Sequence, residues 1–196
     1  MKQAYLIAFL LIIAVFDVRA AEVPVSTNQQ VLGFTPRLKK EAEIRASFKK
    51  LSRVVDLLDS GAQLEIYRGV PRALVNDFEE SLGNRRSDNK ELMSRYASVF
   101  YARGEPASIK DSKKLLALVK TPQSFKEFSG FKFCGWFHPN YALVWIKGKR
   151  VVEIHVCLTC HEIKIFHSRL EIYCEMDDDA YQQFLQLGKD LKVESE

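Results

Sequence analysis

Four short segments near the C-terminus are rich in apolar residues, with clear alternation in the second, and tight turns separate them. They cover residues 141–146, 150–158, 163–166 and 170–174. The first turn is Lys147-Gly148-Lys149 and the last is His167-Ser168-Arg169. A period of two over segments of this length is typical of strands, and turns this short join only antiparallel neighbours. The sequence therefore predicts a C-terminal four-stranded antiparallel meander.

The apolar positions change phase between the second and third segments. The alternating apolar residues of the second segment are even-numbered, from Val152 to Leu158, whereas Ile163 and Ile165 are odd-numbered. Because side chains alternate along a strand, the chain must turn or bulge around Thr159-Cys160-His161 to keep both sets on one core. The Cys157-x-x-Cys160 segment is therefore expected at a tip of the sheet.

Apolar residues at helical spacing predict amphipathic helices before and after the meander. Over residues 36–61 they recur every three or four positions, at Ile44, Phe48, Leu51, Val55 and Leu58. Ser108 with Asp111 resembles a capping box, and the aspartates at 177–179 suit the start of a final helix. A composition of 47% apolar and 28% charged residues is that of a globular protein. We expect a single α+β domain over residues 36–196, with the meander packed against these helices.

The N-terminus has the pattern of a secretory signal peptide. Met1-Lys2 is a basic start, Ala4 to Phe16 is continuously apolar, and Val18-Arg19-Ala20 suits a cleavage site. We expect a signal peptide over residues 1–20, a flexible tether over residues 21–35, and a periplasmic or secreted protein. The apolar run is shorter than the roughly 20 residues that span a bilayer, so no membrane span is expected in the mature chain. Export permits disulfides.

Charge and motif content disfavour several classes of function. The 29 Lys and Arg residues oppose 25 Asp and Glu residues, and a net charge of +4 is too weak to predict a nucleic-acid partner. The chain has no Gly-x-Ser-x-Gly elbow, phosphate-binding glycine loop, His-Glu-x-x-His or dinucleotide fingerprint. No hydrolase or nucleotide enzyme is predicted, and enzymatic activity stays open. His155 on a strand and His167 at a turn are interpreted as ordinary polar positions.

Strand register predicts that the cysteines gather. The hairpin between the first two segments places Cys157 opposite Pro139, and the last hairpin places Cys174 opposite Glu162. One end of the sheet should then carry all four cysteines and two of the histidines: Cys134, Cys157, Cys160, Cys174, His138 and His161.

Two segments at this end carry a resemblance to known proteins. They are Phe133-Cys134-Gly135-Trp136-Phe137-His138-Pro139 and Val156-Cys157-Leu158-Thr159-Cys160-His161. Together they resemble a family of exported bacterial proteins of uncharacterised function, whose members have a Cys-Gly-x-Phe-His-Pro segment followed by a strand that ends in Cys-x-x-Cys. Ile66-Tyr67-Arg68-Gly69-Val70-Pro71 is similar to a Tyr-x-Gly-Leu-Pro stretch of that family. The resemblance covers residues 63–190 and implies a shared fold and export, but no activity.

Structural disulfides and a metal site are two interpretations of the cysteines. In an oxidising compartment Cys134, Cys157, Cys160 and Cys174 can pair in three ways, and each bridge would contribute about 2 to 4 kcal/mol. Alternatively, Cys134, His138, Cys157 and Cys160 offer three thiolates and one imidazole, a set that suits tetrahedral zinc, with His161 as an alternate ligand. Exported thiols tend to oxidise before they meet zinc, which favours disulfides.

Redox chemistry and haem binding are the other two interpretations. A Cys-x-x-Cys pair can cycle between dithiol and disulfide, but its usual setting is a helix N-terminus. Cys157-Leu158-Thr159-Cys160-His161 matches the c-type haem signature, although the flanking strand pattern argues against a haem pocket. The sequence predicts an exported binding or structural protein with no cofactor or with zinc, and the alternative is an exported thiol–disulfide or haem-bearing redox protein.

Overall fold

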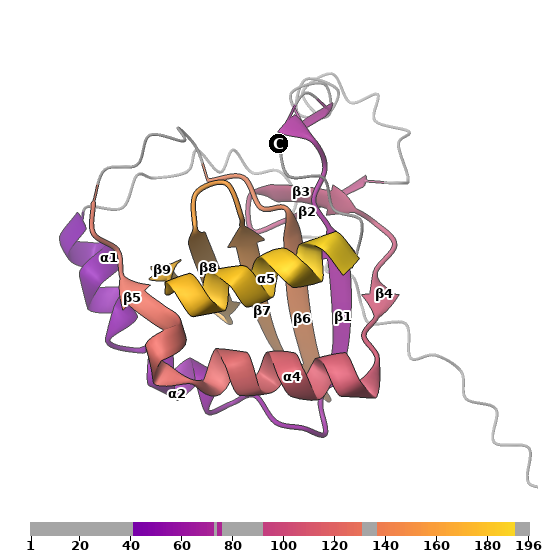
Figure 1. The fold of residues 1–196 in the computed structure, drawn as a ribbon, viewed down its shortest axis with the longest axis horizontal. Helices are drawn as coiled ribbons and strands as arrows, with labels where there is room; N and C mark the ends of the chain where they lie inside the picture. The colour runs from indigo at the N-terminus through magenta and orange to yellow at the C-terminus, as the bar shows by residue number, and fades with distance from the viewer. Residues whose placement is uncertain (1–40, 73, 76–91, 131–136, 191–196) are drawn as a thin grey trace, which may run out of the picture. The chain divides into compact units, whose positions relative to one another are not determined.

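The computed structural model, shown in Figure 1, describes residues 41–72, 74–75, 92–130 and 137–190. The predicted signal peptide at 1–20 and the predicted tether at 21–35 lie outside the described residues, as does Cys134. No helix in the described ranges is both long enough and apolar enough to cross a membrane.

A seven-stranded antiparallel sheet forms the centre of the fold, and its strand order is β4-β1-β6-β7-β8-β9-β5. The strands are β1 (Gln63–Arg68), β4 (Glu105–Pro106), β5 (Phe125–Glu127), β6 (Tyr141–Lys147), β7 (Arg150–Cys157), β8 (Glu162–His167) and β9 (Leu170–Met176). A separate two-stranded sheet, the β2–β3 hairpin, consists of β2 (Leu92–Arg95) and β3 (Ser98–Tyr101). Tyr96 and Ala97 form its turn, and both have positive φ angles.

The predicted fold class, an α+β domain with a C-terminal four-stranded meander packed with amphipathic helices, was wrong. The protein is mostly antiparallel sheet with few helices, and the consecutive strands β6 to β9 are only its middle. A four-stranded sheet would leave the backbone N–H and C=O groups of its two edge strands unpaired. Here β1 pairs with β6 and β5 pairs with β9, so both of these edges are covered by segments distant in sequence.

The helices whose bounds the structure gives are α1 (Glu41–Phe48), α2 (Leu51–Val55), α4 (Ile109–Lys120), the 3-10 helix η1 (Pro122–Ser124) and α5 (Asp178–Asp190). The single helix expected over residues 36–61 is therefore two helices, separated at Lys49 and Lys50. Ser108 is the N-cap of α4, because its hydroxyl accepts a hydrogen bond from the Asp111 N–H at 3.1 Å, which is one half of the predicted capping box. The final helix begins where the aspartates predicted it.

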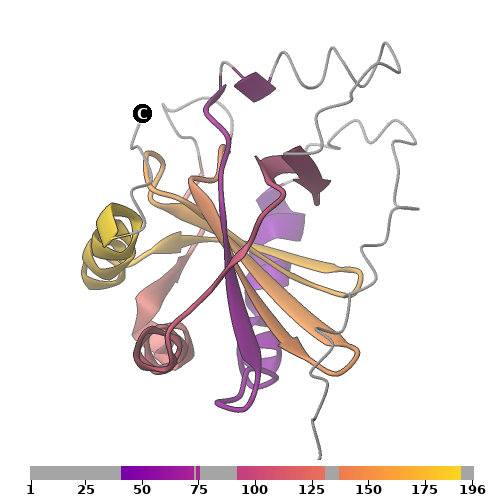
Figure 2. The same ribbon diagram turned by 90° about the vertical axis from the view of Figure 1, so that its right-hand side faces the viewer.

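The two faces of the sheet are covered by different elements. In Figure 2, α4 and α5 lie on one side of the sheet and the β2–β3 hairpin lies on the other. We call these the helix side and the outer face. On the helix side, α2, α4 and α5 bury the main core, whose largest members include Tyr141, Leu143, Ile154, Ile163, Ile165, Ile172 and Phe184. On the outer face, Phe100 of the hairpin packs on Ala142 and Val144.

Candidate functional site

The cysteine end of the sheet comprises residues 137–140, the turn at 158–161 and the adjoining ends of β7, β8 and β9. His161 in the turn has a φ of 56°, a left-handed conformation that a non-glycine residue adopts rarely. The buried Asn140 holds this turn, because its Oδ1 accepts a hydrogen bond from the Leu158 N–H at 2.7 Å. The Cys-x-x-Cys segment therefore lies at a fixed tip of the sheet, as predicted.

Cys157 and Cys174 lie on opposite faces of the sheet. Cys174 belongs to the helix-side core, whereas Cys157 directly follows the core residue Val156 and so points to the outer face. The hairpin register was predicted one residue off, since Cys174 pairs with Ile163 rather than with Glu162. A shift of one residue reverses the face of a side chain. The two sulfur atoms are thus on different sides of the sheet, and both residues carry free thiols.

Cys160 differs from these two thiols, because it is disulfide-bonded. The other two cysteines in the described part of the chain, Cys157 and Cys174, are free. The predicted bridges among Cys134, Cys157, Cys160 and Cys174 stay a prediction, and within the described residues Cys157 and Cys174 carry free thiols.

Burial controls the chemistry of both free thiols. The side chains of Cys157 and Cys174 are 1% and 0% exposed, and burial raises the pKa of each thiol above its usual range. The Cys157 sulfur also accepts backbone N–H groups of His138, Thr159 and Cys160, which oppose the effect of burial without cancelling it. A protonated, buried thiol is a poor nucleophile, so neither residue has the setting of a reactive cysteine.

The predicted metal set is only partly visible. No three His, Cys, Asp or Glu side chains in the described ranges come close enough to hold a metal ion, and that search did not include Cys134. The set Cys134, His138, Cys157 and Cys160 therefore stays a prediction. The alternate ligand, His161, lies against α5, where its ring stacks on Tyr181 with 3.6 Å between the ring centroids.

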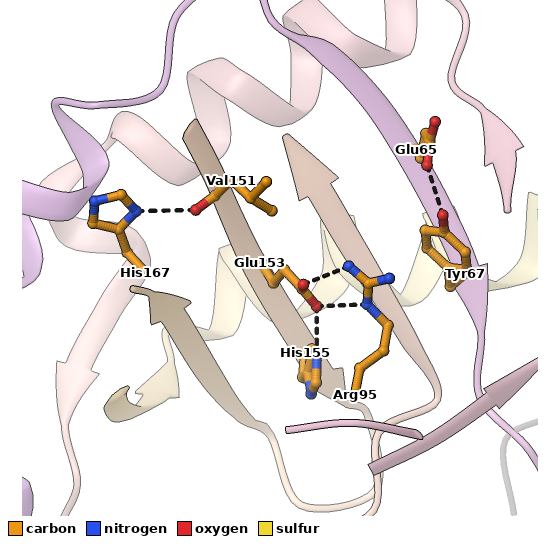
Figure 3. A network of polar contacts seen from close by, with 7 residues as sticks. All are labelled: Glu65, Tyr67, Arg95, Val151, Glu153, His155 and His167. Carbon is orange, nitrogen blue, oxygen red and sulfur yellow. Dashed lines mark hydrogen bonds and ion pairs between the residues drawn. The ribbon is translucent and has the colours of Figure 1, made fainter. Parts of the chain in front are cut away.

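A buried ionic network on the outer face is the second candidate site, shown in Figure 3. Glu153 of β7 accepts two hydrogen bonds from Arg95 of the β2–β3 hairpin, one of them at 2.8 Å from Nε to Oε2. The Nε2 atom of His155 lies 3.3 Å from the same Oε2 atom. The Glu153 side chain is 5% exposed and the Arg95 side chain 19% exposed. This network joins the hairpin to the centre of the sheet.

Aromatic rings enclose the histidine of this network. The His155 ring contacts Phe100 and Phe166 with centroid distances of 4.8 and 4.7 Å, and Tyr96 stacks on Phe166 at 4.2 Å. His155 is fully buried, and its Nδ1 atom has no hydrogen-bond partner among the described residues. With Nε2 donating to Glu153, Nδ1 is left as an acceptor. A substrate cannot reach a ring enclosed in this way, so the arrangement suits structure rather than catalysis.

Glu153 and His155 of β7 make stability depend on pH. Burial lowers the pKa of His155, and its hydrogen bond to Glu153 reverses only part of that effect. Burial alone would raise the pKa of Glu153, but hydrogen bonds from His155 and Arg95 and the Arg95 charge leave it lowered. In each case the stabilisation is complete above the unfolded pKa, near 6.5 for His and 4.5 for Glu, and is lost as pH falls through the folded pKa.

We therefore expect the free energy of unfolding to decline as pH falls from about 6.5 to 5, with His155 contributing at most about 1.4 kcal/mol per pH unit. A His155→Phe variant keeps an aromatic ring in the pocket and removes this titration, so its decline should be smaller. Urea titrations at pH 7.5, 6 and 5 measure both proteins. Equal declines would show that the His155 ring does not stay neutral in the folded state.

Sequence reasoning missed this network. Glu153 and His155 occupy the polar positions of an alternating strand, which usually face water. The β2–β3 hairpin, more than 50 residues earlier in the chain, covers them instead. The only local signal is the spacing of the two residues, which places two ionisable side chains on the same face of an otherwise apolar strand.

The chain matches no protein-family model, no curated protein and no solved structure. The resemblance to exported bacterial proteins with a Cys-Gly-x-Phe-His-Pro segment therefore stays a prediction. Function has to be argued from the described side chains.

Proposed function

We propose that the chain is an exported binding or structural protein whose cysteine end is closed by a disulfide between Cys134 and Cys160. One observation carries this proposal: the free thiols of Cys157 and Cys174 are buried on opposite faces of the sheet, while Cys160 is oxidised. Thiol–disulfide catalysis needs a thiolate that a substrate can reach. The described cysteines offer none, and a bridge from Cys160 serves stability instead.

The proposed bridge would hold the segment that precedes β6 against the turn between β7 and β8. The loop it closes is long, and in the chain-entropy account such a crosslink stabilises the folded state by about 3 to 4 kcal/mol. Export through the predicted signal peptide supplies the oxidising compartment that the bridge requires. The buried network of Arg95, Glu153 and His155 has a parallel role on the outer face, where it fixes the hairpin.

A zinc site at the same end is the second candidate, and one observation favours it. The Cys157 sulfur accepts three backbone N–H groups, an arrangement that also stabilises a thiolate bound to a metal ion. In that case Cys134 and Cys160 would be reduced and would join Cys157 and His138 as ligands. The redox and haem alternatives have less support, since burial raises the pKa of Cys157 and the His161 ring stacks on Tyr181.

Intact mass measured on protein purified from a periplasm without reductant tests the proposal. We expect a mature N-terminus at Ala21, two alkylatable thiols after denaturation, a peptide that joins Cys134 to Cys160, and no stoichiometric zinc. A Cys160→Ser variant should gain a third alkylatable thiol and lose about 2 to 4 kcal/mol of stability. Cys174→Ala, which removes a free thiol, is the matched control and should keep the bridge.

Four alkylatable thiols with one zinc ion per chain would replace this proposal with the metal site. A covalent haem mass would replace it with the redox alternative. A chain that keeps residues 1–20 would contradict export.

A further inference from the structure

Two turns lie together at the end of the sheet opposite the cysteine end. They are the turn between β6 and β7, with Gly148 at a φ of 59°, and the turn between β8 and β9, with Ser168 at 54°. Both are visible as neighbouring hairpin tips in Figure 2. They line a shallow depression of about 590 Å³, the basic depression, formed by Lys147, Lys149, Arg150 and His167.

The protein compensates only part of the positive charge in the basic depression, through Asp59, which pairs with Lys147 and attracts Arg150. Lys147 and Arg150 are direct cross-strand partners, a placement of like charges that destabilises a sheet. Lys147 is relieved by an ion pair with Asp59. Lys149 and Arg150 are exposed and make no ion pair with any residue that the structure describes. An anion bound beside Lys149 and Arg150 would compensate the charges of these two side chains.

His167 gives the basic depression a fixed polar atom. Its Nδ1 atom lies 2.9 Å from the carbonyl oxygen of Val151, as Figure 3 shows. A carbonyl only accepts, so Nδ1 carries a hydrogen, and this bond sets the orientation of the ring. The ring thereby forms a fixed wall of the depression. Donors of two chemical types, ammonium and guanidinium, line the same concave surface.

We propose that the basic depression binds a phosphate group. A phosphate has several acceptor oxygens and about two negative charges, so it can accept from Arg150 and Lys149 at once and neutralise both. A carboxylate carries one charge and would leave part of the repulsion in place. The phosphate can belong to a free molecule or to a lipid headgroup, and both sources present the same oxygens. This site is independent of the disulfide proposed above.

Titration of the full chain with pyrophosphate, at fixed ionic strength and pH 6.5, tests the proposal. We expect the melting temperature to rise with pyrophosphate concentration, as it does for any ligand that binds only the folded state. The double variant Lys149→Gln/Arg150→Gln should bind at least tenfold more weakly. The control Lys113→Gln/Lys114→Gln, which removes the same charge from exposed positions on α4, should bind as the original protein does.

Vesicles of phosphatidylglycerol and of phosphatidylcholine distinguish the two sources. If the protein binds pyrophosphate but does not prefer the anionic vesicles, the natural ligand is a free phosphate compound. If the protein binds the anionic vesicles and the Lys149→Gln/Arg150→Gln change abolishes this binding, the ligand is a lipid headgroup. Both results support the site. Loss of binding to the same degree in both double variants would overturn it, because the effect would then come from overall charge. So would the absence of binding to pyrophosphate and to anionic vesicles alike.

Discussion

Replacing Glu153 by Ala will lower the free energy of unfolding by about 3 kcal/mol. The change leaves the Arg95 guanidinium without its two hydrogen bonds and the buried His155 Nε2 atom without an acceptor. Removing one partner of a buried ion pair costs about 3 to 5 kcal/mol. We expect the lower end of that range because the Arg95 side chain keeps 19% exposure and can turn toward water. Urea unfolding monitored by circular dichroism measures the change.

Glu105→Ala is the matched control for this experiment. Its ion pair with Arg68, at 4.0 Å, joins two side chains that are about half exposed, so its loss should cost less than about 1 kcal/mol. Glu153→Gln keeps the shape of the side chain and removes the charge, and it should fall between these two variants. A Glu153→Ala protein as stable as the Glu105→Ala protein would show that the network does not hold the hairpin.

Gly69→Ala will destabilise the protein by about 3 kcal/mol or more, because the chain passes too close to itself for a Cβ atom. An added Cβ would lie 2.0 Å from the Pro139 carbonyl oxygen and 2.8 Å from that of Asn140. Both obstacles are backbone atoms, and the Gly69 N–H donates to Asn140 at 2.7 Å, so the two segments cannot separate without losing this bond. Overpacking of this kind falls in the upper range of single-residue effects.

Gly61→Ala is the comparison for Gly69→Ala. At position 61 the nearest atom to an added Cβ is Oδ1 of the Asp59 side chain at 3.2 Å, which can rotate away. We expect a change below about 1 kcal/mol there. Soluble yield and urea midpoint report on both variants, and equal values would contradict the close approach of β1 to the segment before β6.

Local patterns predicted the individual elements better than their assembly. Alternation located the strands from residue 141 onward, and the Ser108 hydroxyl located the start of α4. The edge strand β5 escaped because its pairing with β9 is set by tertiary contacts and its three residues have little periodicity of their own. The expected helix over residues 36–61 is broken at Lys49 and Lys50. After the break, Val54 and Val55 of α2 are buried in the main core, whereas Phe48 of α1 is only partly buried against it.

For the candidate site too, the local position of residues was predicted, but their tertiary contacts were not. Sequence spacing correctly placed the Cys-x-x-Cys segment at a turn, but the register was one residue off, and Cys174 pairs with Ile163 instead of Glu162. No local pattern could predict that Arg95 would cover Glu153, since their contact depends on how the β2–β3 hairpin docks.

The rate of thiol alkylation in the folded protein tests most directly whether the cysteines serve structure rather than redox chemistry. Folded protein without denaturant is treated with iodoacetamide at pH 8, and the modified peptides are quantified over time. We predict that Cys157 and Cys174 are modified only at the slow rate of unfolding, because both are buried and burial raises the pKa of each thiol. Rapid and complete modification of Cys157 in the folded state would contradict this account and show a reactive thiol beside Cys160.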